Sequence, residues 1–445
     1  MPTTAYWAPN QAAVAQVETY VFSAPNSVGN TYTATINGKS VTYASVAGDT
    51  AATAATGLFN LLNIAPSTGG PLELTEITFA NPSSGVMTAT AAAPGTPFAN
   101  VPGTTLGLVL STGNGLANGI ATAHTQANQS PSDVNDPQNW LRVTGSAPGV
   151  RQLPQNGDNG VVANTSVPML WNLDQLASLQ WNTYQRWQSF TGTIGLPENN
   201  PNGYTEWRAT YFKFVGPQGS VPAGGLQMVL GYNSGSGSGP SRERYNVGSQ
   251  PTTLICLAAG QPADEWGIRF LGVHTANTFT ATNGVSLGIA MLPGEVAGLS
   301  SCTIDGGATV GIGAGVVWTA GAVLTTFGGS VIINSAPSTI TGSNGTQFTF
   351  GTDALTWPTI TVQSNCAMSW LCGGIVTTLT MSVGCSLDKS NDGRAMTITN
   401  HTIDGDSCYI NDPLNAITFT NAGSVKQQVQ QGPYRFTGTR TMKLT

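Results

Sequence analysis

The stretch that decides the fold is GAVLTTFGGSVIINS, residues 321–335, in which two short apolar and Thr-containing runs flank Gly328 and Gly329. Val, Ile and Thr favour β-strands, and adjacent glycines favour a tight turn because they adopt positive φ without steric cost. We therefore expect two short strands joined by a turn. Comparable stretches recur toward the C-terminus.

The recurrence has a nearly constant period. Strand-like segments of the type TIT, LTMS or ITFT are centred on Thr303, Thr325, Thr341, Thr361, Thr380, Thr399 and Thr418, with separations of 22, 16, 20, 19, 19 and 19 residues. A second strand-like run follows most of them, as SVIIN follows LTTF. A period of about twenty residues with tight turns is typical of a solenoid in which each rung pairs with the next. Earlier rungs are expected near residues 252–257 and 278–280.

The predicted fold class is therefore mainly β, with a small N-terminal α+β module followed by a parallel β-helix or solenoid. A two-sheet sandwich also contains short strands, but it does not require a fixed period. We expect three segments: the N-terminal module at residues 1–119, a linker and solenoid entry at 120–160, and the parallel β-helix at 161–445.

Composition supports a folded chain with a neutral surface. The chain has 445 residues, of which only 8% are charged and 40% are hydrophobic, and its formal net charge is -6. The scattered Lys and Arg residues form no basic stripe, so we expect no nucleic-acid partner. No apolar run of about 18 residues occurs, and the first residues lack the pattern of a secretory signal. We expect synthesis in a cytoplasm and no membrane span.

The N-terminal segment contains local signals for its own elements. Alternating residues flank Asn37 and Gly38, which predict a β-hairpin, and Asp49 or Thr50 can cap a helix that follows. Two further strands are expected at residues 72–79 and 86–91.

Two groups of motifs resemble known families. AVAQV at residues 13–17, YTATINGKSVTY at 32–43 and GDTAATAATGL at 48–58 together resemble a small module common in virion proteins of tailed phages. Asn139 and Trp140, with residues 154–158, 173–175 and 191–197, resemble a pattern in β-helical proteins of phages and of some environmental bacteria. These resemblances imply a place in a virion and imply no chemistry.

Six cysteines and three histidines show no spacing that would predict a zinc site. Cys366 and Cys385 each follow a rung threonine by five residues, so they are expected to stack. We favour a buried ladder of small apolar side chains over a disulfide or metal ladder.

Acidic residues are the next candidates for a site. Asp305 and Asp404 each occur in the sequence TIDG, and the stretch SLDKSNDG at residues 386–393 adds Asp388 and Asp392. Paired carboxylates can hydrolyse glycosides or bind calcium, but Asp-Gly sequences also form ordinary tight turns, and we favour turns.

The remaining candidates also favour structural roles. His124, His274 and His401 are isolated, and no nucleophile motif accompanies them. The glycine-rich segment 232–244 lacks the Lys-Ser/Thr of a phosphate-binding loop and predicts a surface loop, with Arg242, Glu243 and Arg244 against a neighbouring subunit. Trp140, Trp171, Trp181, Trp187 and Trp207 are expected to cap the solenoid rather than to form a sugar platform. We expect no catalytic, cofactor-binding or metal-binding residue.

The sequence favours a non-enzymatic structural protein of a tailed-phage virion, assembled in the host cytoplasm. The preferred hypothesis is a homotrimeric decoration or cement protein bound to the major capsid protein on the outer shell. The first alternative is a tail fibre or tailspike that binds or cleaves host surface glycans. The second alternative is a bacterial surface β-helix adhesin.

Overall fold

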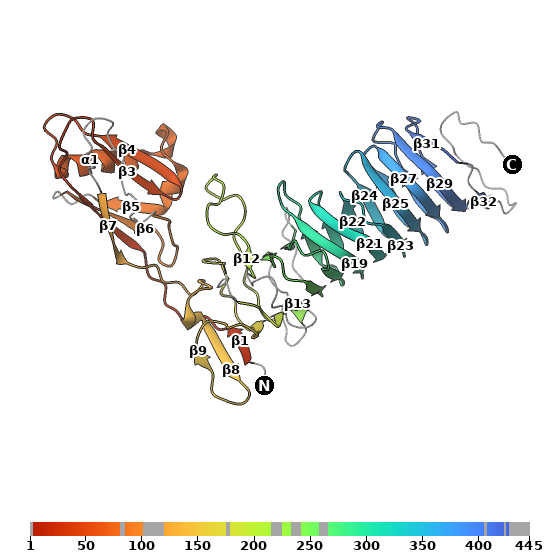
Figure 1. Cartoon of the computed structure of the whole chain (residues 1–445), viewed down its shortest axis with the longest axis horizontal. Coiled ribbons are helices and arrows are strands. Elements are labelled where there is room, and N and C mark those ends of the chain that lie inside the picture. The colour runs from red at the N-terminus through yellow and green to blue at the C-terminus, as the bar shows by residue number, and fades with distance from the viewer. Residues whose placement is uncertain are drawn as a thin grey trace.

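The computed structural model describes residues 3–80, 85–100, 120–174, 179–214, 225–232, 242–257, 266–404, 407–421 and 424–426. Figure 1 shows two arms, a small module and a long solenoid, which diverge from the region of strands β1 (Thr3–Trp7), β8 (Trp140–Thr144) and β9 (Val150–Arg151). The solenoid is built from two long sheets whose strands alternate along the chain.

The first sheet, sheet I, has 16 strands. Besides β1, β8 and β9 it contains β10 (Asn159–Val162), β11 (Thr183–Trp187), β13 (Leu226–Tyr232), β15 (Thr252–Cys256), β17 (Thr278–Ala281), β19 (Ala297–Asp305), β21 (Val316–Phe327), β23 (Thr339–Ser343), β25 (Leu355–Val362), β27 (Gly374–Met381), β29 (Met396–Asp404), β31 (Ile417–Phe419) and β32 (Ser424–Lys426).

The second sheet, sheet II, has ten strands and forms another side of the solenoid. It contains β12 (Phe212–Lys213), β14 (Glu243–Asn246), β16 (Ile268–Leu271), β18 (Ser286–Ile289), β20 (Thr309–Ile312), β22 (Ser330–Ile333), β24 (Gln347–Phe350), β26 (Ala367–Trp370), β28 (Ser386–Asp388) and β30 (Tyr409–Asn411).

The predicted repeat is confirmed by the strand register. Thr303 pairs with Thr325, and the register continues through Thr341 and Thr361 to Thr380. From β10 onward, each strand of sheet I lies parallel to its neighbours, as does every strand of sheet II. This pairing establishes a parallel solenoid and excludes the two-sheet sandwich.

The last two positions of the predicted repeat, Thr399 and Thr418, are wrong. Thr380 pairs with Thr402 rather than with Thr399, and Thr418 pairs with Thr397. The reason is a longer turn: seven residues separate β28 from β29, whereas three separate β26 from β27. The extra residues lengthen this rung, so the constant spacing of Thr-containing segments no longer follows the register.

The interior of the solenoid is one continuous apolar core. In β25, the side chains of Trp357, Ile360 and Val362 point inward and are fully buried, while Thr359 and Thr361 point outward. The same alternation recurs in neighbouring rungs, so each rung buries its inward side chains against the rungs above and below.

The small module contains a four-stranded antiparallel sheet in the order β5-β6-β2-β7, a hairpin and one helix. Its elements are β2 (Val17–Phe22), β3 (Thr31–Ile36), β4 (Lys39–Ala44), α1 (Ala51–Leu62), η1 (Pro66–Thr68), η2 (Leu72–Glu76), β5 (Ile77–Ala80), β6 (Val86–Ala91) and β7 (Ile120–Gln126). As predicted, Asn37 and Gly38 form the hairpin turn with positive φ, and Thr50 caps α1.

The strand predicted at residues 72–79 is only partly correct. Leu72–Glu76 form a 3-10 helix, and the strand begins at Ile77. Pro71 precedes the helix in an extended conformation, and the hydroxyl of Thr75 donates to the carbonyl of Leu72 at 2.7 Å. These local interactions stabilise a helical turn where the apolar alternation predicted a strand.

The chain enters the solenoid before it forms the module. Strand β1 pairs in parallel with β10 and antiparallel with β8, so it belongs to sheet I. Strand β7 pairs with β2 of the module. The module therefore lies in the sequence between β1 and the rest of the solenoid, and we call it the inserted module. The strand pairing crosses the expected boundary between residues 119 and 120, since β1 precedes it and β7 follows it.

Two chain segments connect the inserted module to the solenoid and pair with each other. The amide of Val14 donates to the carbonyl of Gln129 at 2.8 Å, and the reverse bond measures 3.3 Å. Asn139, at the end of η3 (Pro137–Asn139), is fully buried beside this two-stranded neck. Its side chain accepts from the amides of Asn10 and Gln11 and donates to the carbonyls of Ser130 and Asp133. One side chain therefore holds both segments.

We predict that Asn139→Ala lowers the free energy of unfolding by about 3 kcal/mol, because it leaves buried backbone groups without partners. Urea denaturation followed by tryptophan fluorescence measures the change. Asn400→Ala is the control, since Asn400 is exposed. A loss no larger than that of the control would contradict the role of Asn139.

Candidate functional site

Three of the four acidic residues singled out from the sequence, Asp305, Asp388 and Asp404, lie at the ends of strands, and Asp392 lies in the turn between β28 and β29. Asp305 accepts a hydrogen bond from the amide of the next residue at 2.7 Å. Asp388 accepts from the amide of Ser390 and from the side chain of Asn411, at 2.9 and 3.0 Å. The carbonyl of Asp404 accepts from amides three and four residues later. These groups stabilise turns between strands.

Asp392 has a further role, which the sequence did not reveal. The side chain of Lys389 is fully buried, and its ammonium group donates to the carbonyl of Cys372 at 2.6 Å and pairs with Asp392. Arg394 donates to the same carboxylate at 2.6 Å. Burial alone would raise the pKa of Asp392, but the hydrogen bonds from Lys389 and Arg394 outweigh it and lower the pKa. Asp392 therefore balances a buried lysine.

We predict that Asp392→Asn lowers stability at pH 7 by about 2 kcal/mol, because it leaves the buried Lys389 without a counter-charge. A carboxylate whose pKa is lowered by folding stabilises the protein above its ordinary pKa of 3.8, and this contribution disappears as the pH falls through the folded value. Stability of the wild-type protein should therefore fall more steeply below pH 4 than stability of the variant.

Urea denaturation across this pH range measures both effects. Asp388→Asn is the matched control, because Asp388 contacts only neutral groups in its turn, and it should cost about 1 kcal/mol. Equal losses in the two variants would contradict the proposed balance of charge.

The cysteines at the entrance to sheet II form a ladder. The carbonyl of Cys366 accepts from the amide of Ser386, and the carbonyl of Cys385 accepts from that of Tyr409, so Cys366, Cys385 and Cys408 occupy the same position in successive rungs. Stacking of the first two was predicted. The third was missed because Cys408 lies six residues after the rung residue Thr402, whereas Cys366 and Cys385 lie five residues after Thr361 and Thr380.

All six cysteines are free. A hydrogen bond with the thiol of Cys385 lowers the pKa of Cys366, and the same contact together with burial raises the pKa of Cys385. Each of these two thiols also donates to a carbonyl three residues earlier, at 3.0 and 2.9 Å. The ladder is therefore packed into a corner of the solenoid core.

The histidines lie on separate elements. His124 is in β7, where its backbone pairs with that of Glu18. Its side chain is among those that the structure does not describe. His274 accepts a hydrogen bond from the amide of Ala276 at 3.1 Å. His401, in β29, packs with its ring centroid 4.7 Å from that of Phe419, and burial lowers the pKa of His401.

The segment at residues 232–244 lies outside the described residues from 233 to 241. Its last residues form β14, and the expectation that they contact another subunit is wrong for two of them. Glu243 is fully buried and pairs with the equally buried Arg186, and Arg244 is buried against Glu198. The alternation of β14 directs Glu243 into the core, where a buried arginine neutralises it.

The tryptophan cap predicted from the sequence is confirmed for Trp140 and Trp181. Both are fully buried, and the rings of Trp7, Trp140 and Trp181 lie in series with centroid distances of 5.2 and 5.9 Å. The indole nitrogen of Trp140 donates to the carbonyl of Val134 at 2.7 Å. Trp7 comes from β1, so the start of the chain helps to close the first rungs. Trp187 is half-buried and bonds to the side chain of Gln185.

Trp171 and Trp207 serve a different purpose. The guanidinium of Arg208 lies 4.8 Å from the ring centroid of each. Trp207 also packs against the core of the inserted module. Trp171 is 9% exposed, and its carbonyl accepts from the amide of Val134 in the solenoid entry at 3.1 Å. Arg208 therefore lies at the junction between the two arms.

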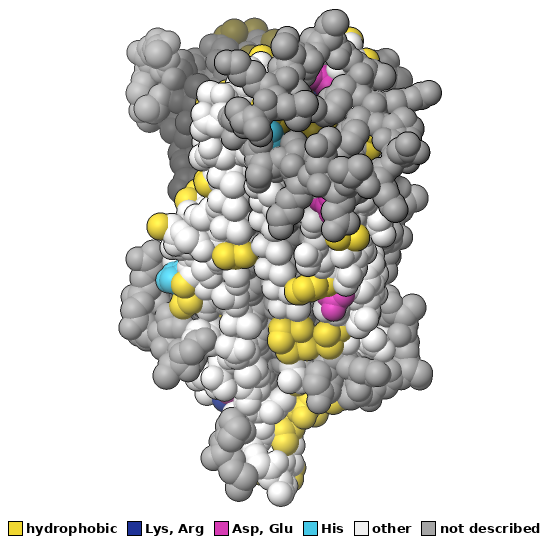
Figure 2. Space-filling model, turned by 90° about the vertical axis from the view of Figure 1, so that its right-hand side faces the viewer, with side chains coloured by type: hydrophobic (Ala, Val, Ile, Leu, Met, Phe, Trp, Pro, Cys, Tyr) yellow, Lys and Arg dark blue, Asp and Glu magenta, His cyan; other side chains and the backbone are white. Residues whose placement is uncertain are grey.

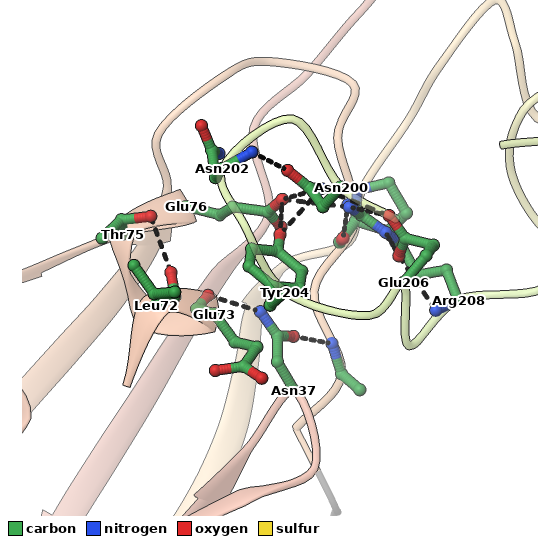
Figure 3. A network of polar contacts seen from close by, with 12 residues as sticks. Asn37, Leu72, Glu73, Thr75, Glu76, Asn200, Asn202, Tyr204, Glu206 and Arg208 are labelled. Carbon is green, nitrogen blue, oxygen red and sulfur yellow. Dashed lines mark hydrogen bonds and ion pairs between the residues drawn. The ribbon is translucent and has the colours of Figure 1, made fainter. Parts of the chain in front are cut away.

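Figure 3 shows the polar network at this junction, where a loop of the solenoid entry meets the end of η2 in the module. Arg208 donates to Glu206 at 2.8 Å and to Glu76 of the module at 3.0 Å. The hydroxyl of Tyr204 also contacts Glu76, and Asn200 donates to that hydroxyl at 3.0 Å. Burial alone would raise the pKa of Glu206, but hydrogen bonds from Arg208 outweigh it and lower the pKa.

This junction is the most elaborate polar site that we find in the described residues, and the sequence did not predict it. Glu76 and Arg208 are 132 positions apart, so no local motif connects them. The only available signal was the pair Trp207 and Arg208 beside Glu206. The geometry positions the module and suits no evident reaction, since both carboxylates are paired with the same arginine.

We predict that Arg208→Ala loosens the junction and lowers stability by about 3 kcal/mol, because two partly buried carboxylates lose their partner. Small-angle scattering should show a broader distribution of distances between the arms. Lys213→Ala is the control, since the ion pair of Lys213 with Asp174 is exposed and contributes little. Unchanged scattering and stability in the arginine variant would contradict this role.

Within the described residues, no group of three or more His, Cys, Asp and Glu side chains is arranged to hold a metal ion. The same residues contain no helix with the length and apolar character needed to cross a membrane. Comparison with protein families, with curated proteins and with solved structures finds no match for this chain. The fold, the junction and the sequence motifs described above are therefore the basis for any functional inference.

Proposed function

We propose that this chain is a non-enzymatic structural protein of a tailed-phage virion, a decoration or cement protein on the outer shell. In this proposal the inserted module binds the major capsid protein and the solenoid projects outward. The proposal also keeps assembly in the host cytoplasm and a homotrimer. The resemblance of the module and of the solenoid entry to phage proteins supports it.

The observation that carries the proposal is how the module is mounted. A two-stranded neck connects it to the solenoid, and the Arg208 network ties it to a second point far along the chain. Two separate attachments resist rotation better than a single flexible linker would. A rigid bracket of this kind suits a protein that must transmit load between a shell and an external arm.

The surface of the module offers an apolar contact. Val28 and Val46 are 67% and 59% exposed, and they lie on adjoining loops, because the amide of Gly29 donates to the carbonyl of Ser45 at 2.8 Å. Apolar side chains exposed next to each other favour burial against a partner. Among the described residues, the face seen in Figure 2 shows few charged side chains, and apolar side chains gather in several patches across it.

The tail fibre or tailspike alternative requires carboxylates available to a glycan. Asp305 and Asp388 accept hydrogen bonds from turn amides, and Asp392 pairs with Lys389 and Arg394. These pairings favour structural roles for the three side chains. The decoration hypothesis therefore remains our proposal.

We predict that the double variant Val28→Asp with Val46→Asp weakens binding to coat-protein shells by at least about tenfold, because two apolar contacts become charged. Co-sedimentation with purified shells measures the change. Val317→Asp is the matched control, because Val317 is similarly exposed but lies on the solenoid. Equal binding of the double variant and the wild type would show that this patch is not the contact.

A deletion tests the proposal as a whole. Residues 16–127 are replaced by a short glycine linker, which the hydrogen-bonded positions of Val14 and Gln129 permit without loss of β1. The solenoid should fold, with a circular dichroism spectrum of β-structure, and should no longer bind shells. A folded deletion protein that still decorates shells would refute the role of the module.

A further inference from the structure

Two columns of outward side chains run along one face of sheet I from β17 to β29. In the first column, threonines occupy seven successive rungs in direct register: Thr280, Thr303, Thr325, Thr341, Thr361, Thr380 and Thr402. The second column lies two residues earlier in each strand and contains Thr278, Ser301, Val323, Thr339, Thr359, Thr378 and Asn400. We call the two columns the threonine grid.

The grid has a fixed repeat. Parallel strands lie about 4.8 Å apart, and side chains two residues apart on one strand are separated by about 6.6 Å. Threonine is branched at Cβ, so each side chain has few rotamers, and the strands are held in register on both sides. Hydroxyl and methyl groups therefore recur at regular intervals along the whole first column, and along the second column from Thr339 through Thr359 to Thr378.

The grid hydroxyls are available to water. Thr303, Thr325, Thr341 and Thr361 are half-exposed, and within the described residues no hydrogen bond joins their side chains to another protein group. Inward threonines behave differently, as the hydroxyl of Thr326 donates to that of Thr346 at 2.9 Å. The ends of the second column are different: Thr278 donates to the hydroxyl of Thr253 at 3.3 Å, and Asn400 accepts from the side chain of Asn421 at 2.8 Å. The hydroxyls of Thr303, Thr325, Thr341 and Thr361 thus form an ordered array of donors and acceptors that no described protein group occupies.

The composition of the grid restricts its partner. It contains no charged side chain, which disfavours nucleic acids and anionic surfaces. It contains no aromatic ring on which a sugar could stack. Protein interfaces depend on large anchors such as Trp, Tyr and Arg, whereas Ser and Thr rarely contribute strongly. The remaining partner with matching chemistry is a neutral, rigid lattice of hydroxyl-type groups.

We propose that the threonine grid binds the surface of ice. Its hydroxyls hold water molecules at fixed positions that can continue an ice lattice, and its methyl groups fill the spaces between them. Because the side chains are already ordered by the solenoid, little conformational entropy is lost on binding. This inference uses residues of the solenoid only and does not rest on the proposed virion role.

The grid is limited to two columns. The next outward position along the strands holds side chains as different as Asp305, Phe327 and Gln363. A regular lattice cannot match such a mixture. The predicted contact is therefore a long, narrow strip parallel to the solenoid axis.

Ice-affinity partitioning of the fluorescently labelled full-length protein tests the proposal. The wild type should be enriched in ice grown slowly on a cold surface, relative to an unrelated globular protein. The double variant Thr341→Tyr with Thr361→Tyr should lose enrichment by about tenfold, because bulky rings lift the grid off the lattice and remove its short-range contacts. Thr349→Tyr is the matched control, since Thr349 points outward from sheet II; it should partition like the wild type.

A second pair of substitutions guards against misfolding. Thr341→Val with Thr361→Val keeps the shape and the methyl groups and removes only two hydroxyls, so it should fold and bind ice more weakly than the wild type. Exclusion of the wild type from ice to the same degree as the unrelated protein would refute the proposal. A tyrosine variant that partitions into ice like the wild type would also refute it. If that variant in addition dissociates an oligomer in sedimentation, the grid would be assigned to contact with a second copy of the chain.

Discussion

The structure depends on the parallel, in-register pairing of successive rungs. A single rung buries too little apolar surface to be stable, so each one relies on backbone hydrogen bonds and inward side chains of its neighbours. This constraint fixes which residues stack: Ile340 lies beside Ile360, and Ile360 beside Leu379, in the core. It also explains how a chain with few charged residues forms a long ordered body: backbone hydrogen bonds and apolar packing, rather than ion pairs, hold successive rungs together.

A solenoid must be closed at its first rungs, and the cap here uses residues from distant parts of the chain. Strand β1 adds the edge that β10 needs and contributes Trp7 to the tryptophan series with Trp140. Because β1 precedes the inserted module, folding of the cap brings the two ends of the module together. The neck, Asn139 and the Arg208 network then hold the module in place. Stability of the solenoid and placement of the module are thus physically coupled.

Much of the fold could be predicted because its signals are local. Period, turn residues and the capping Thr50 each act within a few positions, and they predicted the rungs, the hairpin and α1. The prediction failed where a local pattern competed with a nonlocal constraint. Thr399 matched the period but not the register, because the turn around Lys389 is longer than its neighbours. Glu243 appeared in a surface loop, yet it lies in the core opposite Arg186.

The junction could not be predicted for a related reason. Arg208 acts through Glu76 and two tryptophans that only the folded chain brings together. By contrast, Asp305 and Asp388 were expected to stabilise tight turns, and their side chains accept hydrogen bonds from amides in those turns. The sequence thus located the repeating body well, whereas the connection between the two arms required the three-dimensional structure.

Cryo-electron microscopy of the particles or assemblies that contain this protein tests the proposed function most directly. The account predicts density at regular positions on the outer shell, with the inserted module against the coat subunits and the solenoid directed outward. Density confined to the tail, or a solenoid lying against the coat with the module free, would contradict it.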